Sequence, residues 1–410
     1  MAIIRPFRAV RPLDKVAHLV ASVPYDVVNR EEAAELAKGN PLSFLRVTRS
    51  EIELDSSISP YADEVYKKAA ENFKRLREEA PLIQEDKPSF YVYKLIMGEQ
   101  EQVGIAATFS SEDYNNDIIM KHEKTRKVKE DDRTNHIVTT EAQTGAVFLT
   151  YKGVSAVNDV VSNTMETSPI YDFTAPDGIR HTVWIMPEEY NEIVINEIAN
   201  VKNLYIADGH HRAASASRSQ KVKKDNNPSH NGTEEYNYFL AVLFPAEELK
   251  ILPYNRVVFD LKGMSANDFI EKVKQYFDVR QCDFPSPKER KTICMYIENN
   301  WYLLKPNSNV VPGEAVGDKL DVSLLQNFLL KPILGVEDIR TDTNVDFIGG
   351  IRGTEELEKL VDSGKAAVAF SMYPVEVQDL INISDAGETM PPKSTWFEPK
   401  LRDGLVVHTI

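Results

Sequence analysis

The sequence predicts an α+β fold with mixed sheets, interleaved helices and two to three subdomains. Apolar β-rich segments alternate with amphipathic helical segments, but without the regular strand–helix–strand rhythm that a doubly wound sheet requires. The chain has 410 residues, which is more than one ordinary hydrophobic core accommodates. Its 42% hydrophobic and 27% charged residues are typical of globular proteins.

Residues 1–85 are the first expected domain, an N-terminal helical and strand segment. A helix is expected over residues 30–38, because Gly39 follows and closes it. A second helix is expected over residues 61–79, where apolar side chains recur at helical spacing from Val65 to Leu76.

Residues 86–254 are expected to form a central domain that holds a phosphate site. Segments 89–97 and 102–109 predict a β-hairpin over the loop 98–101. The pattern then predicts a charged helix over 121–144, strands over 146–151 and 181–186, a helix over 188–199, a strand from Leu204, and a strand over 236–244. Residues 221–235 predict a flexible polar loop, which is either a lid over the site or a connection without a functional role.

Residues 255–410 are expected to form a C-terminal α+β domain with a proline-rich closing tail. Helices are predicted over 267–277, 322–330 and 355–361, and strands over 292–297, 301–304 and 366–370. Prolines at positions 391, 392 and 399 exclude regular structure from the tail.

Composition excludes several classes of function. The net charge of −15 argues against a general nucleic-acid binder, which needs a basic face. Cys282 and Cys294 are too few for a disulfide framework. The N-terminus lacks an apolar signal region, and no apolar run reaches the roughly 20 residues of a membrane span. We therefore expect a cytoplasmic protein with neither nucleic-acid nor membrane partners; the sequence is compatible with a homo-oligomer.

The stretch 204–212 carries the strongest chemical signal. A short apolar segment leads into Asp208-Gly209-His210-His211-Arg212, and alanines and serines follow, so a helix is expected to start there. A helix N-terminus attracts phosphate through its unpaired amides and its dipole, and arginine holds phosphate bidentately. We expect Arg212 to grip phosphate, Asp208 to hold Mg²⁺ or accept a proton, and His210 or His211 to act as acid, base or phosphorylated nucleophile. The ordinary alternative is a turn whose arginine pairs with an acidic neighbour.

A second cluster of charged residues occupies positions 121–133. On the expected helix, Glu123, Arg126 and Arg133 share one broad face. Such a face is usually a solvated ladder of ion pairs, which is the alternative to a functional role. The candidate base is Glu123, and the candidate ligand-binding residues are His122, Thr125, Arg126, Lys129 and Arg133.

Two further segments carry weaker signals, and several motifs are absent. Val23-Pro24-Tyr25-Asp26-Val27, with residues 40–46 beyond it, is by itself typical of turns. In the proline-rich tail, Lys393, Ser394 and Thr395 are candidate anion ligands, and Lys400 could close over an anion with them. A C-terminal strap on the core explains these residues equally well. The phosphate loop Gly-x-x-x-x-Gly-Lys-Ser/Thr and the Gly-x-Gly-x-x-Gly fingerprint are missing from the sequence. The standard nucleotide-binding folds are therefore unsupported.

Four motifs together resemble the domain of unknown function 1015 family, in the family's order and over nearly the whole chain. They are Pro24-Tyr25-Asp26-Val27; Lys121-His122-Glu123-Lys124-Thr125 with Lys129 and Asp132-Arg133; Ala207-Asp208-Gly209-His210-His211-Arg212; and Met390-Pro391-Pro392-Lys393-Ser394-Thr395 with Phe397 and Pro399-Lys400. The third motif is also similar to the nucleotide-phosphate box of the partition-protein and sulfiredoxin-like superfamily, which includes free-serine kinases.

The resemblances imply a central sulfiredoxin-like phosphate-binding core. In it, Gly209, His210, His211 and Arg212 would wrap phosphates, with Asp208 near a metal. Sulfur chemistry is not implied, because His210 stands where sulfiredoxin-type members carry a reactive cysteine. Members of the family are often encoded beside serine-biosynthesis enzymes, which makes serine or phosphoserine the first substrate to consider.

The sequence thus predicts a kinase or phosphatase that acts on a small hydroxylated metabolite. Glu123 would take the hydroxyl proton, Arg126, Lys129 and Arg133 would complete a cationic wall, and ATP or ADP with Mg²⁺ would serve a transfer reaction. The alternative is a non-catalytic nucleotide-binding regulator, in which the same turn binds a nucleotide and shifts a conformation.

Overall fold

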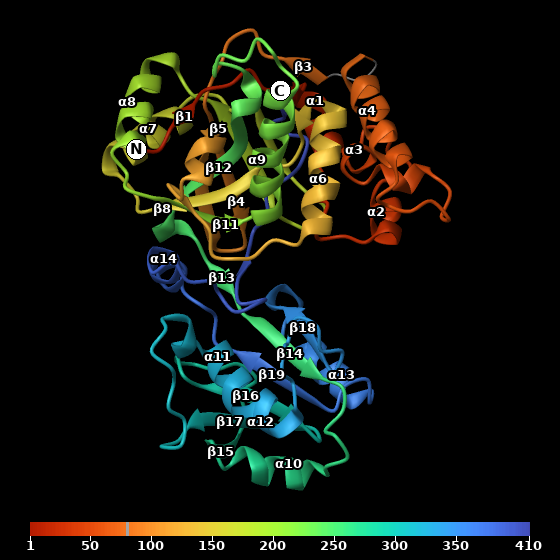
Figure 1. Cartoon of the computed structure of the whole chain (residues 1–410), viewed down its shortest axis with the longest axis vertical. Coiled ribbons are helices and arrows are strands. Elements are labelled where there is room, and N and C mark those ends of the chain that lie inside the picture. The colour runs from red at the N-terminus through yellow and green to blue at the C-terminus, as the bar shows by residue number, and fades with distance from the viewer. Residues whose placement is uncertain (79–81) are drawn as a thin grey trace. The chain divides into compact units, whose positions relative to one another are not determined.

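The computed structural model describes residues 1–78 and 82–410 and confirms the α+β class (Figure 1). The chain forms two compact units. Unit 1 comprises Met1–Leu249 and Pro399–Ile410, and unit 2 comprises Lys250–Glu398. The C-terminal segment is therefore built into the first unit.

Unit 1 is organised around a nine-stranded mixed sheet. In order across the sheet, the strands are β6 (Ile119–Met120), β11 (Leu204–Asp208), β8 (Val147–Tyr151), β12 (Tyr238–Pro245), β5 (Gln100–Ser110), β4 (Tyr91–Met97), β10 (Arg180–Ile185) and β9 (Tyr171–Thr174), with β1 (Ile4–Arg5) beside β5. β11 pairs parallel with β6 and antiparallel with β8, while β8 and β12 are parallel. The carboxyl end of β11 lies at Asp208, where the predicted site begins.

Helices cover the sheet through small and branched apolar side chains. Those that pack on it are α7 (Ser155–Met165), α8 (Asn191–Ala199) and α9 (His210–Asp225), whose buried residues join one core with strand residues such as Ile105 and Leu149. α6 (Lys127–Thr140) lies beside α9 (Figure 1). Ala213 and Ala216 are buried in this region, and their small side chains permit the close approach of α9.

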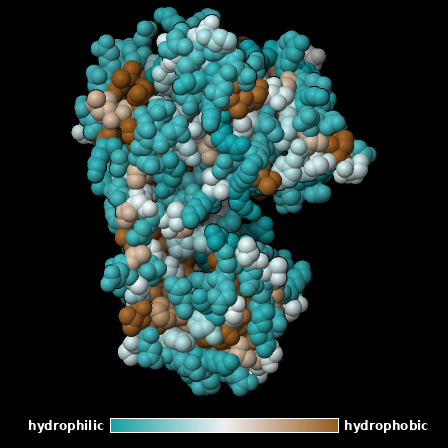
Figure 2. Space-filling model, viewed as in Figure 1, coloured by the Kyte–Doolittle hydropathy of each residue, from teal (hydrophilic) through white to brown (hydrophobic). Residues whose placement is uncertain are grey.

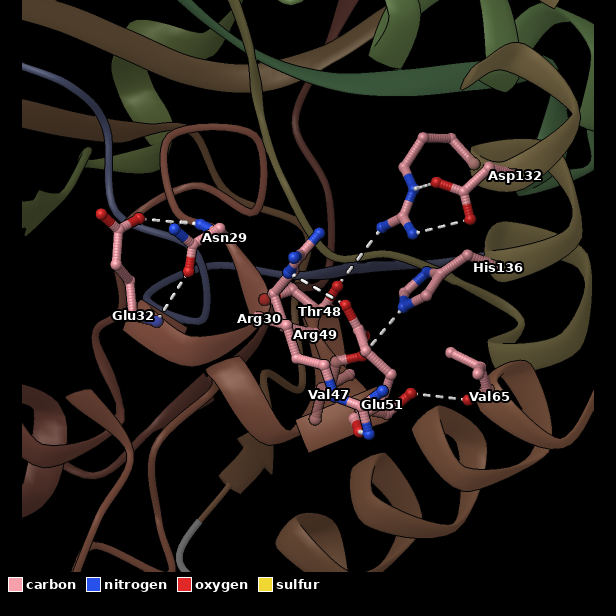
Figure 3. Close-up of polar contacts among 12 residues, drawn as sticks. Asn29, Arg30, Glu32, Val47, Thr48, Arg49, Glu51, Val65, Asp132 and His136 are labelled. Carbon is pink, nitrogen blue, oxygen red and sulfur yellow. Dashed lines mark hydrogen bonds and ion pairs between the residues drawn. The ribbon is translucent and has the colours of Figure 1, made fainter. Parts of the chain in front are cut away.

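The remaining helices of unit 1 come from its first 115 residues. They are α1 (Asp14–Val20), α2 (Arg30–Leu36), α3 (Leu45–Thr48), α4 (Asp63–Glu78) and α5 (Ser111–Asn115), with short strands β2 (Val10–Pro12), β3 (Leu82–Gln84), β7 (Ala142–Gln143) and β21 (His408–Thr409). Figure 3 shows one attachment of α6 to α3, in which His136 Nε2 lies 3.0 Å from the Val47 carbonyl oxygen. A second is made by Arg133, which pairs with Asp132 and donates to the Thr48 carbonyl at 3.4 Å. These bonds hold α6 in place.

Unit 2 contains a six-stranded antiparallel sheet with hydrophobic clusters on both faces. Its strand order is β15 (Phe277–Cys282), β17 (Asn300–Pro306), β16 (Ile293–Ile297), β19 (Val368–Met372), β14 (Tyr254–Val258) and β18 (Val345–Gly349). The helices are α10 (Ala266–Val273), α11 (Asp321–Leu325), α12 (Lys331–Leu334), α13 (Glu355–Asp362) and α14 (Val377–Asp385). A separate pair joins β13 (Ile251–Leu252) to β20 (Trp396–Phe397).

Three expected elements are wrong in extent. The helix expected over 121–144 begins at Lys127 and ends at Thr140, so residues 121–126 form a loop (the 121–126 loop). α9 starts at His210, earlier than expected, and continues to Asp225 because Gln, Lys and Val extend it into the predicted loop 221–235. The helix expected over 267–277 ends at Val273, and Phe277 begins β15. Residue 79, the expected end of the second helix, lies outside the described residues.

The face of the molecule in Figure 2 is mostly hydrophilic, and hydrophobic residues appear on it in small separate groups. Single exposed apolar side chains are ordinary on a protein surface. Across the described ranges, no helix is both long enough and apolar enough to cross a bilayer.

Candidate functional site

The α9 turn, residues 208–212, depends on the glycine at its centre. Gly209 has φ 93° and ψ 32°, a left-handed conformation that lets the chain pass from β11 directly into α9. A Cβ atom at this position would lie 2.9 Å from Arg212 Cζ. Glycine is therefore required twice, for the backbone conformation and for the space that the Arg212 side chain occupies.

Arg212 is buried beneath this turn and is 7% exposed. Its Nη2 lies 2.6 Å from Asp208 Oδ2 and 4.0 Å from Asp26 Oδ2, and its Nη1 donates to the Ala146 carbonyl. Burial alone would lower the pKa of Arg212, but the neighbouring carboxylates of Asp26 and Asp208 outweigh burial and raise that pKa. Both terminal nitrogens are engaged, so the geometry matches the alternative of an internal ion pair rather than the expected grip on phosphate.

Asp208 lies between two cations. Its Oδ1 is 3.4 Å from Lys400 Nζ, and its Oδ2 contacts Arg212. Burial opposes ionisation of Asp208, but the charges of Lys400 and Arg212 prevail and hold the pKa of this carboxyl well below its usual value. The residues do not fit the expected Mg²⁺ site, because cations face both oxygens and the described part of the chain contains no group of three His, Cys, Asp or Glu suited to a metal.

His210 and His211 attach the 121–126 loop to the N-terminus of α9. Nε2 of His210 accepts a hydrogen bond from the His122 amide at 3.4 Å, and Nε2 of His211 accepts one from the Arg126 amide at 3.0 Å. The rings of His122 and His210 also pack edge to face, with centroids 4.3 Å apart. Only a neutral imidazole accepts such a bond, so these contacts require deprotonated histidines.

The burial of these imidazoles favours their neutral forms. Desolvation lowers the pKa of His122 to about 4 and places the pKa of His210 well below its ordinary value. The pKa of His211 is lowered by burial and then by the charge of Arg126. At neutral pH all three side chains are therefore uncharged, and for His210 and His211 this is also what the amide hydrogen bonds demand.

The attached loop brings Glu123 to the α9 turn. Glu123 Oε2 lies 3.6 Å from His210 Nδ1, and the glutamate side chain is 52% exposed. Because His210 Nε2 accepts a hydrogen bond, the ring proton is assigned to Nδ1, on the side of Glu123. The sequence had placed His122 and Glu123 at the start of a helix. In the structure both precede α6, which begins only at Lys127.

The other residues predicted in the 121–133 cluster make mostly structural contacts. The Thr125 hydroxyl donates to Glu130. Lys129 Nζ lies over the Tyr61 ring at 5.5 Å, and Arg133 Cζ lies over the Tyr25 ring at 4.2 Å. Arg133 also pairs with Asp132 at 3.0 Å and is 12% exposed. Arg126, Lys129 and Arg133 were expected to form a cationic wall, and of these three Arg126 is the one that is exposed to solvent.

The tail residues are divided between the two units. Lys393, Ser394 and Thr395 belong to unit 2, where the Ser394 hydroxyl donates to the Pro391 carbonyl at 2.6 Å and Arg256 donates to the Lys393 carbonyl at 3.0 Å. Lys400 belongs to unit 1 and contacts Asp208.

Three further residues adjoin the α9 turn or its arginine. Sequence reasoning named Lys400 only as a tail lysine that could close over an anion, and it treated Asp26 as a turn residue. Both belong to motifs that carried the family resemblance, which was the further signal that pointed to them. Asp403 carried none.

Known proteins provide a comparison for this chain and its fold. No curated protein matches the chain. The chain is similar to the structure of a conserved hypothetical protein from Pyrococcus furiosus (TM-score 0.36, 13% identity, 74% of this chain and 94% of that chain) and to that of a free serine kinase in complex with AMP (0.36, 10%, 74% and 91%). It is also similar to SbnI with C-terminal truncation from Staphylococcus aureus (0.37, 13%, 73% and 86%).

The family comparison covers most of the chain. The model of the family described as "Protein of unknown function (DUF1015)" matches residues 4–323, a range that includes the 121–126 loop and the α9 turn. The resemblance drawn from the motifs is thereby confirmed, and the chain belongs to the DUF1015 family.

Proposed function

We propose that this protein binds the phosphate groups of a small metabolite or nucleotide at the α9 turn and catalyses transfer or hydrolysis of a phosphoryl group. One observation carries the proposal: the Glu123 carboxylate lies 3.6 Å from His210 at the N-terminus of a 16-residue helix. An anion site and an exposed acid–base group are thereby adjacent. The first substrates to consider are serine and phosphoserine.

The amides of the first turn of α9 support anion binding. The first amides of any helix lack partners within the helix, and the N-cap residue Gly209 has no side chain with which to cap them. The helix dipole adds partial positive charge at this end. In this proposal the backbone holds phosphate, while Arg212 acts from below by neutralising Asp208.

Glu123 is the proposed base. Phosphoryl transfer requires positioning and charge neutralisation more than covalent chemistry, and a carboxylate that accepts the substrate hydroxyl proton completes that set. His210 holds its Nδ1 proton toward Glu123 and so orients it. His210 is a poor candidate for the phosphorylated nucleophile, because its Nε2 is already bound to the His122 amide. No step is assigned to a metal.

Turnover assays test this proposal. Purified protein is incubated with serine and either ATP or ADP, and separately with phosphoserine, and the phosphorylated products or released phosphate are measured. Glu123→Gln is expected to lower kcat by about a hundredfold or more. Glu166→Gln, a change at an exposed glutamate at the C-terminal end of α7, is the matched control and is expected to leave kcat unchanged. Absence of turnover by the wild-type protein in every assay contradicts the enzymatic proposal.

One observation favours a regulator as the second candidate. Both histidines of the α9 turn bind amides of the 121–126 loop, so a ligand at this turn would act directly on the loop. In that case ADP or ATP binds, the loop changes its hydrogen-exchange protection, and no product forms.

A further inference from the structure

A buried carboxylate lies behind the α9 turn and has no part in the proposed reaction. Asp403 is 3% exposed, in the C-terminal segment that returns to unit 1. Its main chain is fixed by an isolated antiparallel bridge: the Asp403 amide donates to the Ser22 carbonyl at 2.9 Å, and the Ser22 amide donates to the Asp403 carbonyl at 3.1 Å. The position of this carboxylate is thus set by backbone bonds.

Asp403 and Arg212 face a common small cavity of about 30 Å³. Its polar lining includes Tyr25, Arg133 and His136, and Gly145 leaves room for the aspartate, because a Cβ there would lie 3.0 Å from Asp403 Oδ1. Two buried atoms, Arg212 Nε and Asp403 Oδ2, find no hydrogen-bond partner among the described residues. A donor and an acceptor on a cavity of this size are suited to a bound water molecule.

Charged groups from three elements surround this carboxyl. Arg212 comes from α9, Arg133 from α6, and Asp26 from the segment between α1 and α2, where the backbone of Tyr25 also hydrogen-bonds to the carboxyl. Burial raises the pKa of Asp403 to about 7, against the lowering influence of Arg212 and Arg133. His136, on the cavity wall, is kept neutral by burial, which lowers its pKa to about 4.

We propose that Asp403 is a proton-binding positioning residue of this site, and that binding of an anion at the α9 turn is accompanied by uptake of a proton on the Asp403 carboxyl. The second part rests on the proposed function. Three carboxylates, those of Asp26, Asp208 and Asp403, share the charge of Arg212. A bound anion adds further negative charge beside this group. Protonation of Asp403 from solvent removes one negative charge and leaves Arg212 to balance Asp208 and the anion.

The first experiment needs no ligand. Side-chain carboxyl resonances are followed by carbon NMR in protein labelled at aspartate, between about pH 4.5 and 8.5. One resonance is expected to titrate with a midpoint of about 7 and to be missing from Asp403→Asn. A midpoint below about 5, near that of an ordinary aspartate, overturns the inference. If Asp403→Asn does not fold, Gly145→Ala replaces it for assignment, because its methyl group presses on the same carboxyl and shifts its resonance.

The second experiment measures protons taken up on binding. Inorganic sulfate, whose charge is constant over this pH range, is titrated by calorimetry in two buffers of different ionisation enthalpy. Up to one proton per sulfate is expected in the wild type, with affinity rising by at most about tenfold per pH unit on acidification. Asp403→Asn is expected to bind sulfate without this linkage, and Asp159→Asn, on the exposed side of α7, to behave as wild type.

The two failures are distinguishable. Sulfate that binds wild type without proton uptake contradicts the role of Asp403. A protein that binds no sulfate, while the Asp403 resonance still titrates near pH 7, contradicts the anion site of the proposed function and the coupling but leaves the proton site standing.

Discussion

Glu123 Oε2 and His210 Nδ1 lie 3.6 Å apart, although one residue belongs to the loop before α6 and the other begins α9. The contact exists because His210 and His211 accept hydrogen bonds from the amides of His122 and Arg126. The histidines of the α9 turn thus act first as acceptors that position a loop, and the chemistry proposed for Glu123 depends on that attachment.

Removal of either acceptor is expected to loosen the 121–126 loop. A hydrogen bond of this kind contributes about 1 kcal/mol net, so its loss corresponds to about a fivefold rise in opening. In His211→Ala, the amide of Arg126 should therefore exchange with deuterium about fivefold faster than in wild type. His18→Ala, a change at an exposed histidine on α1, is the control. Unchanged exchange at Arg126 would show that the His211 contact does not hold the loop.

Gly209→Ala is expected to destabilise the protein more than an alanine at another left-handed glycine. Gly178 has φ 82° and open space around its Cβ position, so Gly178→Ala reports backbone strain alone, about 1 kcal/mol. Gly209 has φ 93° and would also place its Cβ 2.9 Å from Arg212. We expect a loss of about 2–4 kcal/mol in the free energy of unfolding measured with urea. Equal losses in the two variants would mean that the Arg212 side chain moves away from the new methyl group without lowering the free energy of unfolding.

Lys400→Met is expected to lower stability at neutral pH and at every pH above the depressed folded pKa of Asp208. Lys400 helps to depress the pKa of Asp208, and a depressed carboxyl pKa contributes stability above the unfolded value of about 3.9 that is lost as pH falls through the folded value. The side chains of Lys400 and Asp208 are 14% and 31% exposed, so the loss at pH 7 should be about 1–2 kcal/mol.

The control for this prediction is Lys223→Met. It removes a surface pair with Glu141, whose side chain is 69% exposed, and should cost under about 1 kcal/mol. Urea unfolding near pH 7, in the wild-type and Asp208→Asn backgrounds, provides the comparison. A Lys400→Met deficit that is as large with Asp208→Asn as without it would assign the loss to packing rather than to the ion pair.

Acidification is expected to weaken the attachment of the loop. The folded pKa of His122 is about 4, below the unfolded value of about 6.5, so the unfolded state binds protons first. Stability should therefore fall as pH decreases from about 6.5 toward 4, with a shallower fall in His122→Gln. The measurement is the free energy of unfolding at about pH 7 and 5. An equal change in the free energy of unfolding between the two pH values in wild type and variant would show that His122 does not cause the loss of stability on acidification.

The sequence predicted those features that local pattern determines. The hairpin of β4 and β5 and the strand β12 follow from alternating and continuous apolar runs, and the strand–turn–helix at Asp208 follows from an apolar run that ends in Asp-Gly. Each of these depends on neighbours in the chain, which a single sequence displays.

Features that depend on distant partners were not predictable. Residues 121–126 have a helical composition, but their amides bind histidines of another element and the helix starts only at Lys127. Arg212 pairs with Asp208, the neighbour that the sequence offered as an alternative, but its second carboxylate is Asp26, which sequence treated as a turn residue. The expectation that the tail prolines exclude regular structure is wrong for Trp396–Phe397, which form β20 by pairing with the distant strand β13. Nor did the prolines indicate that Lys400 and Asp403 re-enter unit 1.

A crystal structure with a bound phosphorylated ligand, ADP together with serine, tests the central claim most directly. The proposed function predicts phosphate oxygens within hydrogen-bonding distance of the first amides of α9, and the serine hydroxyl beside the Glu123 carboxylate. A ligand bound elsewhere, with the α9 amides unoccupied and Glu123 turned away from it, would contradict the account.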